Sequence, residues 1–204
     1  FTAEVECEHF VRIYKGDNRV AQLSIYALAD DLAERIPLRG DFHMHTCRSD
    51  GREDPGTVCA NYRAIGYDFI VITDHHRYYP SLEAMELYRN APLFLTILPG
   101  EEVHLPMTDV HIVNAGGTFS VNGLLEASPN DQDKGTDPRY RSLDGNCPAI
   151  VPADEYRRQV EEIASSAALV DCPDNVERIS YAVCLWAFAR IREAGGLGIF
   201  AHPY

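Results

Sequence analysis

The residues with the clearest chemical potential in this 204-residue chain lie between Asp41 and Gly51, in the sequence DFHMHTCRSDG. His43 and His45 are two positions apart, and alternate residues of a strand point to the same face, so both imidazoles can aim at one point. Asp50 follows in a Ser-Asp-Gly turn, from which its short carboxylate can return over the strand end. Because imidazole nitrogens and carboxylate oxygens are common metal ligands, this pattern predicts a metal site.

Four further segments repeat the pattern of a short apolar run beside a metal-type side chain. They are residues 69–72 before Thr73-Asp74-His75-His76, 93–98 before Pro99-Gly100-Glu101-Glu102, 110–113 with His111, and 197–200 before Ala201-His202-Pro203. Each run is too short for a helix and is typical of a strand. In parallel α/β architectures, functional groups gather at the carboxyl ends of the strands, so these side chains can meet in one pocket.

The motifs HMHT with SDG, TDH, PGEE, VHIV and AHP resemble, in type and order, those of the PHP (polymerase and histidinol phosphatase) family of metal-dependent phosphoesterases. The similarity runs from about Leu38 to Tyr204 and is tightest between Asp41 and Val113. It implies an α/β fold, a distorted seven-stranded β/α barrel, with two or three divalent metals at the strand ends. The GEEVH segment and the region around HMHT also resemble the PHP-like subgroup that includes carbaryl-type ester hydrolases.

The resemblance implies a set of metal ligands, which are His43, His45, Asp50, His75, Glu102, His111 and His202. Neutral imidazoles suit zinc, iron and manganese, and a carboxylate can bridge two ions. We expect Glu102 to be that bridge, with Glu101 as the alternative, because side-chain alternation lets only one of the two face the pocket. His104 shares the face of Glu102 and either joins the site or caps its edge.

Two residues beside His75 are predicted to assist catalysis. Asp74 is expected to orient a ligand imidazole from behind. His76 is expected to contact a substrate anion, as Arg77 and Tyr78 can as well. An exposed loop after any strand is also polar, so a purely structural role for His76 stays open.

The chemistry that the resemblance implies is hydrolysis, in which metal-bound hydroxide cleaves a small phosphate ester or a short oligonucleotide. Two alternatives stay open: cleavage of carboxyl or carbamate esters by the same site, and a non-catalytic, metal-binding regulatory module. Cys47 is a weaker candidate nucleophile, because no dedicated base accompanies it. An amidohydrolase site is disfavoured, because no lysine that could bridge its metals lies between Lys15 and Lys134.

The flanking sequence divides the chain into an N-terminal β extension, residues 1–37, and a PHP-like metallohydrolase domain, residues 38–204. Within the extension, residues 4–26 predict a hairpin around a Lys15-Gly16-Asp17-Asn18 turn. The family's late Asp-x-His motif is not found before Tyr204, so we expect the domain to be truncated at its C-terminus.

Helices must connect the strands that carry the ligands. They are expected over residues 55–65, 81–89, 154–169 and 176–194, where apolar side chains recur at helical spacing or punctuating residues mark the ends. Asp54 is the expected cap of the first helix, Pro55 its first residue and Gly66 its end. This order favours parallel strand pairing. Residues 127–151, rich in Pro, Asp, Asn and Gly, are predicted to form a lid whose Arg139 and Arg141 contact an anion, and a solvated linker is the alternative.

Composition narrows the partners and the location. Lys and Arg number 18 against 31 Asp and Glu, and the net charge of -13 argues against binding long nucleic acids. We therefore expect a small phosphorylated or ester substrate. Six cysteines without a CxxC pair indicate reduced thiols and a cytoplasmic protein. No run reaches the roughly 18–20 apolar residues of a membrane span, so no membrane partner is expected.

Overall fold

The computed structural model describes residues 5–125, 141–166, 169 and 172–202 as a mixed α/β chain. The chain divides into two compact units, Phe1–Leu38 and Arg39–Tyr204. None of the helices in the described ranges combines the length and the apolar composition that crossing a bilayer requires.

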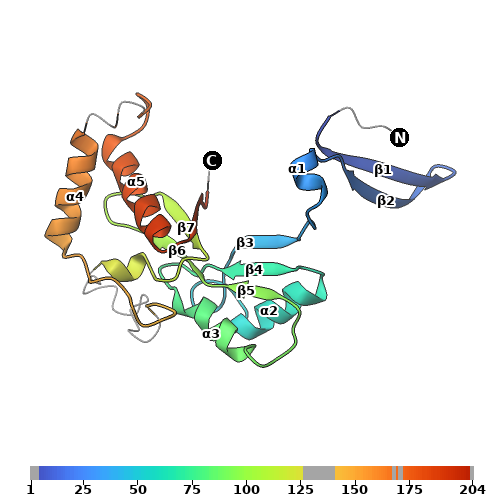
Figure 1. The fold of residues 1–204 in the computed structure, drawn as a ribbon, viewed down its shortest axis with the longest axis horizontal. Coiled ribbons are helices and arrows are strands. Elements are labelled where there is room, and N and C mark those ends of the chain that lie inside the picture. Colours follow the sequence, from blue (N-terminus) through green and yellow to red (C-terminus); the bar gives the residue numbers. More distant parts are fainter. Residues whose placement is uncertain (1–4, 126–140, 167–168, 170–171, 203–204) are drawn as a thin grey trace. The chain divides into compact units, whose positions relative to one another are not determined.

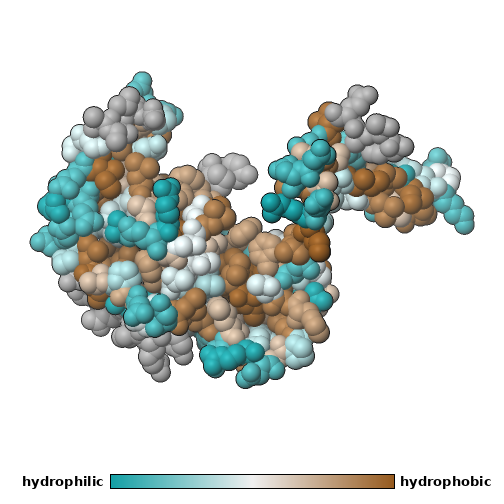
Figure 2. Space-filling model, in the orientation of Figure 1, coloured by the Kyte–Doolittle hydropathy of each residue, from teal (hydrophilic) through white to brown (hydrophobic). Residues whose placement is uncertain are grey.

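The first unit is a two-stranded antiparallel hairpin followed by a short helix. Strand β1 (Glu8–Lys15) pairs with β2 (Asn18–Tyr26), and α1 covers Asp30–Ala33. Gly16 takes a positive φ of 63° in the turn, which confirms the predicted hairpin. Apolar surface covers much of this hairpin (Figure 2), because two strands alone bury little of their side chains.

The second unit begins with a parallel sheet in the order β3-β4-β5. Its strands are β3 (Gly40–Met44), β4 (Phe69–Ile72) and β5 (Thr96–Leu98). Helices α2 (Pro55–Ala64) and α3 (Tyr79–Leu87) connect them and pack against the sheet and each other (Figure 1). The predicted parallel pairing is thus confirmed here, as is the cap of α2, where Asp54 accepts the backbone N–H of Thr57.

A second sheet follows with the order β6-β7-β8, and its pairing is antiparallel. Its strands are β6 (Gly100–His104), β7 (His111–Ala115) and β8 (Leu197–Phe200). Helix α5 (Arg178–Glu193) packs against β7 and β8, and α4 (Ala153–Ser165) packs against α5. Trp186, fully buried on α5, belongs to this core together with Tyr156 and Val160. A short 3-10 helix covers Asn122–Leu124.

The strand structure differs from the prediction around Pro99. Residues 93–98 were expected to form one strand that ends in the acidic pair, but the strand starts only at Thr96, and a separate strand carries Glu101 and Glu102. Proline has no N–H to give to a ladder, so it separates the two strands. The start of the second strand also requires glycine at position 100, because a Cβ there would lie 2.3 Å from Val71 Cγ1 and 2.9 Å from the Asn114 carbonyl oxygen.

The two sheets are joined at the segment that follows β4. His75 forms a parallel bridge with Glu102, the Glu102 N–H donates to Asp74 O (3.2 Å), and the His76 N–H donates to Glu102 O (3.1 Å). Neither sheet closes on itself within the described ranges. The structure therefore shows a mixed α/β fold with several sheets, and the seven-stranded barrel is not seen.

The predicted lid lies largely outside the described residues, which exclude 126–140 and with them Arg139. Arg141, the other predicted anion contact, donates to the Pro148 carbonyl within its own segment at 3.0 Å. That segment pairs back onto the preceding chain through bridges from Phe119 to Ser142 and from Leu125 to Val151.

Candidate metal centre

The HMHT segment places two imidazoles side by side at the end of β3. His43 lies in the strand and His45 directly after it, with their Nε2 atoms 3.0 Å apart. The Ser-Asp-Gly turn brings Asp50 back, and its Oδ1 lies 2.7 Å from His45 Nδ1. A Cβ at Gly51 would lie 2.5 Å from the His45 carbonyl oxygen, so this return needs glycine. The geometry that the spacing predicted is present.

Glu102 occupies the centre of the site and is fully buried in β6. Its Oε2 lies 2.7 Å from His75 Nδ1, 3.1 Å from His45 Nε2 and 3.5 Å from His43 Nε2. Its Oε1 lies 3.0 Å from His111 Nδ1 and 3.3 Å from His202 Nε2. Asp50 joins through its contacts with His45 and, at 3.5 Å, with His75. The structure thus brings the other six predicted ligands together around the carboxylate of Glu102.

The neighbouring Glu101 faces the other side of β6. Its carboxylate, also fully buried, accepts hydrogen bonds from Ser120 Oγ (2.7 Å), the side-chain amides of Asn114 (3.1 Å) and Asn122 (2.8 Å), and the backbone N–H of Val121. The alternation of side chains along the strand separates the two acids. Glu102 is therefore the member of the pair that faces the imidazoles.

His104 joins the cluster, although it is not one of the seven predicted ligands. Its Nε2 lies 2.8 Å from His75 Nδ1 and 3.7 Å from Glu102 Oε2. Its ring stacks on that of His111 with centroids 3.7 Å apart, because the β6–β7 register pairs these two residues directly. The signal in the sequence was its position two residues after Glu102, which puts both on one face of a strand.

The donor set fits divalent cations. Three groups have ligand atoms within 4.8 Å of one another: His43, His45 and Glu102; His45, Asp50 and His75; and His75, Glu102, His104 and His111. Glu102 Oε2 is buried and makes no aligned hydrogen bond with any described residue, although four imidazole nitrogens lie within 3.7 Å. A neutral imidazole has one N–H and one lone pair, so imidazoles packed this closely bring lone pairs together, and a cation would satisfy them.

The electrostatics of the site keep its acid ionised. Burial acts to raise the pKa of Glu102, but interaction with the surrounding imidazoles lowers it overall. Interaction with Glu102 raises the pKa of His45 to about 9, whereas burial lowers the pKa values of His75 and His111. At neutral pH His75 and His111 are therefore neutral, as metal ligation requires, and His45 holds a proton in the absence of metal.

Asp74 supports the loop that carries two of these side chains. Its buried carboxylate accepts the Thr46 N–H (2.9 Å), the Thr46 hydroxyl and the Ser49 hydroxyl (2.6 Å). These bonds fix the chain between His45 and Asp50. The geometry therefore gives Asp74 a positioning role, as the sequence suggested, but toward the loop between His45 and Asp50 rather than toward an imidazole.

His76, the other predicted catalytic residue, follows His75 in a left-handed conformation with a φ of 58°. Its ring packs against His104 with centroids 4.1 Å apart. Around it lies a hollow of about 350 Å³ lined by Ser49, Asp50, His75, His76, Arg77 and His104. A second hollow of about 470 Å³ lies beside His43 and His45 and includes Arg52, Glu53 and Tyr62.

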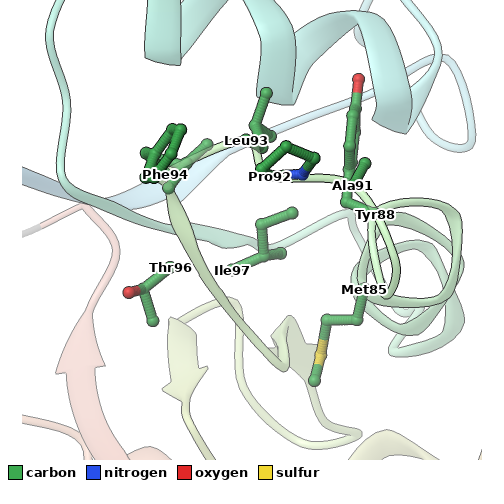
Figure 3. Close-up of a pocket in the computed structure, with 9 residues that line it drawn as sticks. Met85, Tyr88, Ala91, Pro92, Leu93, Phe94, Thr96 and Ile97 are labelled. Carbon is green, nitrogen blue, oxygen red and sulfur yellow. The ribbon is translucent and has the colours of Figure 1, made fainter.

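A third hollow, of about 360 Å³, lies where α3 and the following loop meet β5 (Figure 3). Its lining side chains include Met85, Pro92, Leu93, Phe94 and Ile97. No histidine, acid or basic residue lines it, so it lacks groups for acid–base or metal chemistry. The chemistry of the described residues is concentrated at the cluster around Glu102.

Comparison with known proteins finds similarity to solved structures only. No protein-family model matches the chain, and no curated protein is found to be similar to it. A solved structure from Bifidobacterium adolescentis, provisionally described as a metal-dependent phosphoesterase, is 20% identical with a TM-score of 0.43. The similarity covers 82% of this chain and 68% of that one. Similarity at this level assigns no function, so the functional conclusion rests on the cluster itself.

Proposed function

We propose that this chain is a metal-dependent hydrolase that cleaves a small phosphate ester. The observation that carries this proposal is the buried carboxylate of Glu102 with imidazoles from five separate segments turned toward it. Buried polar atoms with only a structural role usually make hydrogen bonds of good geometry. The Oε2 atom of Glu102 makes no such bond with the described residues.

The residues that would hold the ions fall into groups that share Glu102. His43 and His45 would hold one ion with it, and His75, His104 and His111 a second, while Asp50 and His202 lie at the edges. Divalent ions such as manganese, zinc or iron supply Lewis acidity that activates water and polarises an ester oxygen. Glu102 offsets their charge, and Asp74 holds the loop that carries His45 and Asp50 in place.

The order of the ligand motifs supports a PHP-type domain. In such a domain the parallel sheet β3-β4-β5 and the antiparallel sheet β6-β7-β8 would each be part of the barrel. The preference for a phosphate ester over a carboxyl or carbamate ester draws on the guanidinium of Arg77 and the imidazole of His76 beside the cluster. A phosphate ester carries negative charge that such side chains bind well.

The test is metal content and turnover of the protein loaded with manganese, zinc or iron. We expect bound metal by elemental analysis and metal-dependent hydrolysis of a model phosphate ester. His45→Ala and Glu102→Ala should each lower the bound metal and reduce turnover by at least the roughly 10–100-fold that the loss of an outer-shell partner of a metal ligand costs. His9→Ala, in the first unit, serves as the control with unchanged metal content.

Three results would contradict the proposal in distinguishable ways. Normal metal content in both variants would refute the ligand assignment. Turnover restricted to carboxyl or carbamate esters would replace the phosphoesterase by an ester hydrolase with the same site. Metal binding without turnover of any of these substrates would indicate a regulatory metal-binding module.

A further inference from the structure

We propose that Arg77 and His76 form an anion subsite beside the metal centre, and that this subsite selects substrates with a terminal phosphate dianion, that is, phosphate monoesters. The inference rests on the proposed hydrolase function and narrows its substrate class. Arg77 and His76 are not among the predicted metal ligands. The hollow that they line is also lined by His75 and His104, which belong to the metal cluster.

The position of the hollow is the first observation. His75 and His104 belong to the metal cluster and also line the hollow, so a molecule bound there contacts the cluster directly. Its volume of about 350 Å³ is at the lower end of the range for small-molecule pockets. That space accommodates a phosphate group with part of a small leaving group.

The second observation concerns the ion-pair and hydrogen-bond partners of Arg77. Its half-buried side chain lines the hollow and makes no ion pair or side-chain hydrogen bond with any described residue. Arg48 provides the contrast, since its guanidinium donates to both oxygens of Glu83. In a chain with 31 acidic and 18 basic residues, a half-buried arginine without a carboxylate partner retains its donors for a ligand. The planar fork of a guanidinium matches the oxygens of a phosphate.

The backbone directs both side chains to this place. The His76 N–H donates to Glu102 O and the Arg77 N–H donates to Asp74 O, which hold the left-handed turn at His76 against β6. Helix α3 begins at Tyr79 and carries no acidic residue in its first turn, so no carboxylate there offsets the positive helix end. The one acid that lines the hollow, Asp50, is already engaged by His45 at 2.7 Å.

The second hollow has a different character. It is lined by Arg52, which is exposed, by Glu53, and by the apolar side chains of Met44 and Val58. The carboxylate of Glu53 would repel a dianion. This hollow therefore suits the leaving group of the substrate, and Arg52 provides a matched control for Arg77.

The experiment measures binding of inorganic phosphate to the metal-loaded 204-residue chain by calorimetry, in the wild type and in the variants R77A, R77K and R52A. We expect R77A to weaken phosphate binding at least 10-fold, because a charge-assisted bidentate contact is lost. R77K should restore part of the affinity, and R52A should leave it unchanged. All variants should retain their metal. For a phosphate monoester, R77A should raise KM in the same proportion.

Phosphate affinity that is the same in R77A and wild type, at equal metal content, would overturn the subsite. Equal losses in R77A and R52A would also overturn it, since they would reflect net charge alone. A failure of the hydrolase proposal is distinguishable, because it would appear in the wild type as absent metal or as metal without turnover. R77K covers the case in which R77A does not fold.

Discussion

At the residue scale, the adjacent acids Glu101 and Glu102 have the same side chain and opposite surroundings. Glu101 accepts four hydrogen bonds from donors around it, whereas Glu102 lies among imidazoles. We expect Glu101→Gln to lower the free energy of unfolding of the metal-free protein by about 1–3 kcal/mol, because the new amide group meets donors that then lack an acceptor. Glu102→Gln should cost less stability but lose most of the bound metal.

Urea unfolding and elemental analysis of both variants check this pair. The reverse pattern, with stability lost in Glu102→Gln and metal lost in Glu101→Gln, would show that the faces of β6 have been assigned the wrong way round.

A pH dependence of metal binding follows from His45. Interaction with Glu102 raises the pKa of its imidazole to about 9 in the metal-free protein, so the proton present at pH 7 must leave when the nitrogen binds an ion. Metal affinity should therefore rise with pH, up to roughly tenfold per unit, and level off above about pH 9. Calorimetric titration in buffers of different ionisation enthalpy counts the released protons. Binding at pH 7 without proton release would contradict the assignment of His45 as a ligand.

At the element scale, the sequence predicted the hairpin, the strands at residues 69–72 and 197–200, and the four longer helices, because local periodicity and punctuation encode them. Helix α3 begins two residues earlier than expected and α4 ends earlier. The Glu-rich strand β6 has no such local signature. It pairs with the neighbouring β7 across residues 105–110, whereas the antiparallel pairing of β7 with β8 joins segments far apart in the sequence, and no local pattern encodes that contact.

The switch from one sheet to the other at Pro99-Gly100 can be tested by filling the space at the glycine. Gly100→Ala would place a methyl group 2.3 Å from Val71 Cγ1 and 2.9 Å from the Asn114 carbonyl oxygen. Overpacking of this kind costs roughly 1–3 kcal/mol of unfolding free energy. Because β6 carries Glu102 and His104, metal affinity should fall as well. Unfolding curves and metal titrations identical to those of the wild type would show that the strand can shift without cost.

The candidate site was predictable to the extent that its ligands sit at fixed offsets in short motifs. His43, His45 and Asp50 could be placed from spacing alone, since strand alternation and a turn determine their directions. His104 and Asp74 could be placed only in part, because the stacking of His104 on His111 depends on the register of β6 with β7 and the bonds of Asp74 depend on the packing of the HMHT loop. The choice between Glu101 and Glu102 also required knowing which face of β6 is turned toward the imidazoles.

At the scale of the whole molecule, all residues of the cluster come from the unit Arg39–Tyr204. That unit contains its own buried cores, whereas the hairpin unit exposes Phe10 and Leu23 at 51% and 53%. We expect a chain that lacks residues 1–38 to keep its helical circular dichroism and to bind the same number of ions. Loss of metal from such a folded chain would show that the hairpin unit contributes to the site.

Bound divalent ions would offset part of the net charge of -13. Divalent cations at Glu102 and Asp50 reduce the repulsion among acidic groups, so metal should raise the melting temperature as any ligand of the native state does.

The most direct measurement is anomalous X-ray scattering from crystals of the full-length chain grown with manganese or zinc. The expected result is at least two ions that share Glu102, one also bound by His43 and His45 and the other by His75, His104 and His111. A map at the absorption edge with no ion within coordination distance of Glu102, in crystals whose histidines point elsewhere, would contradict the metal centre and with it the hydrolase.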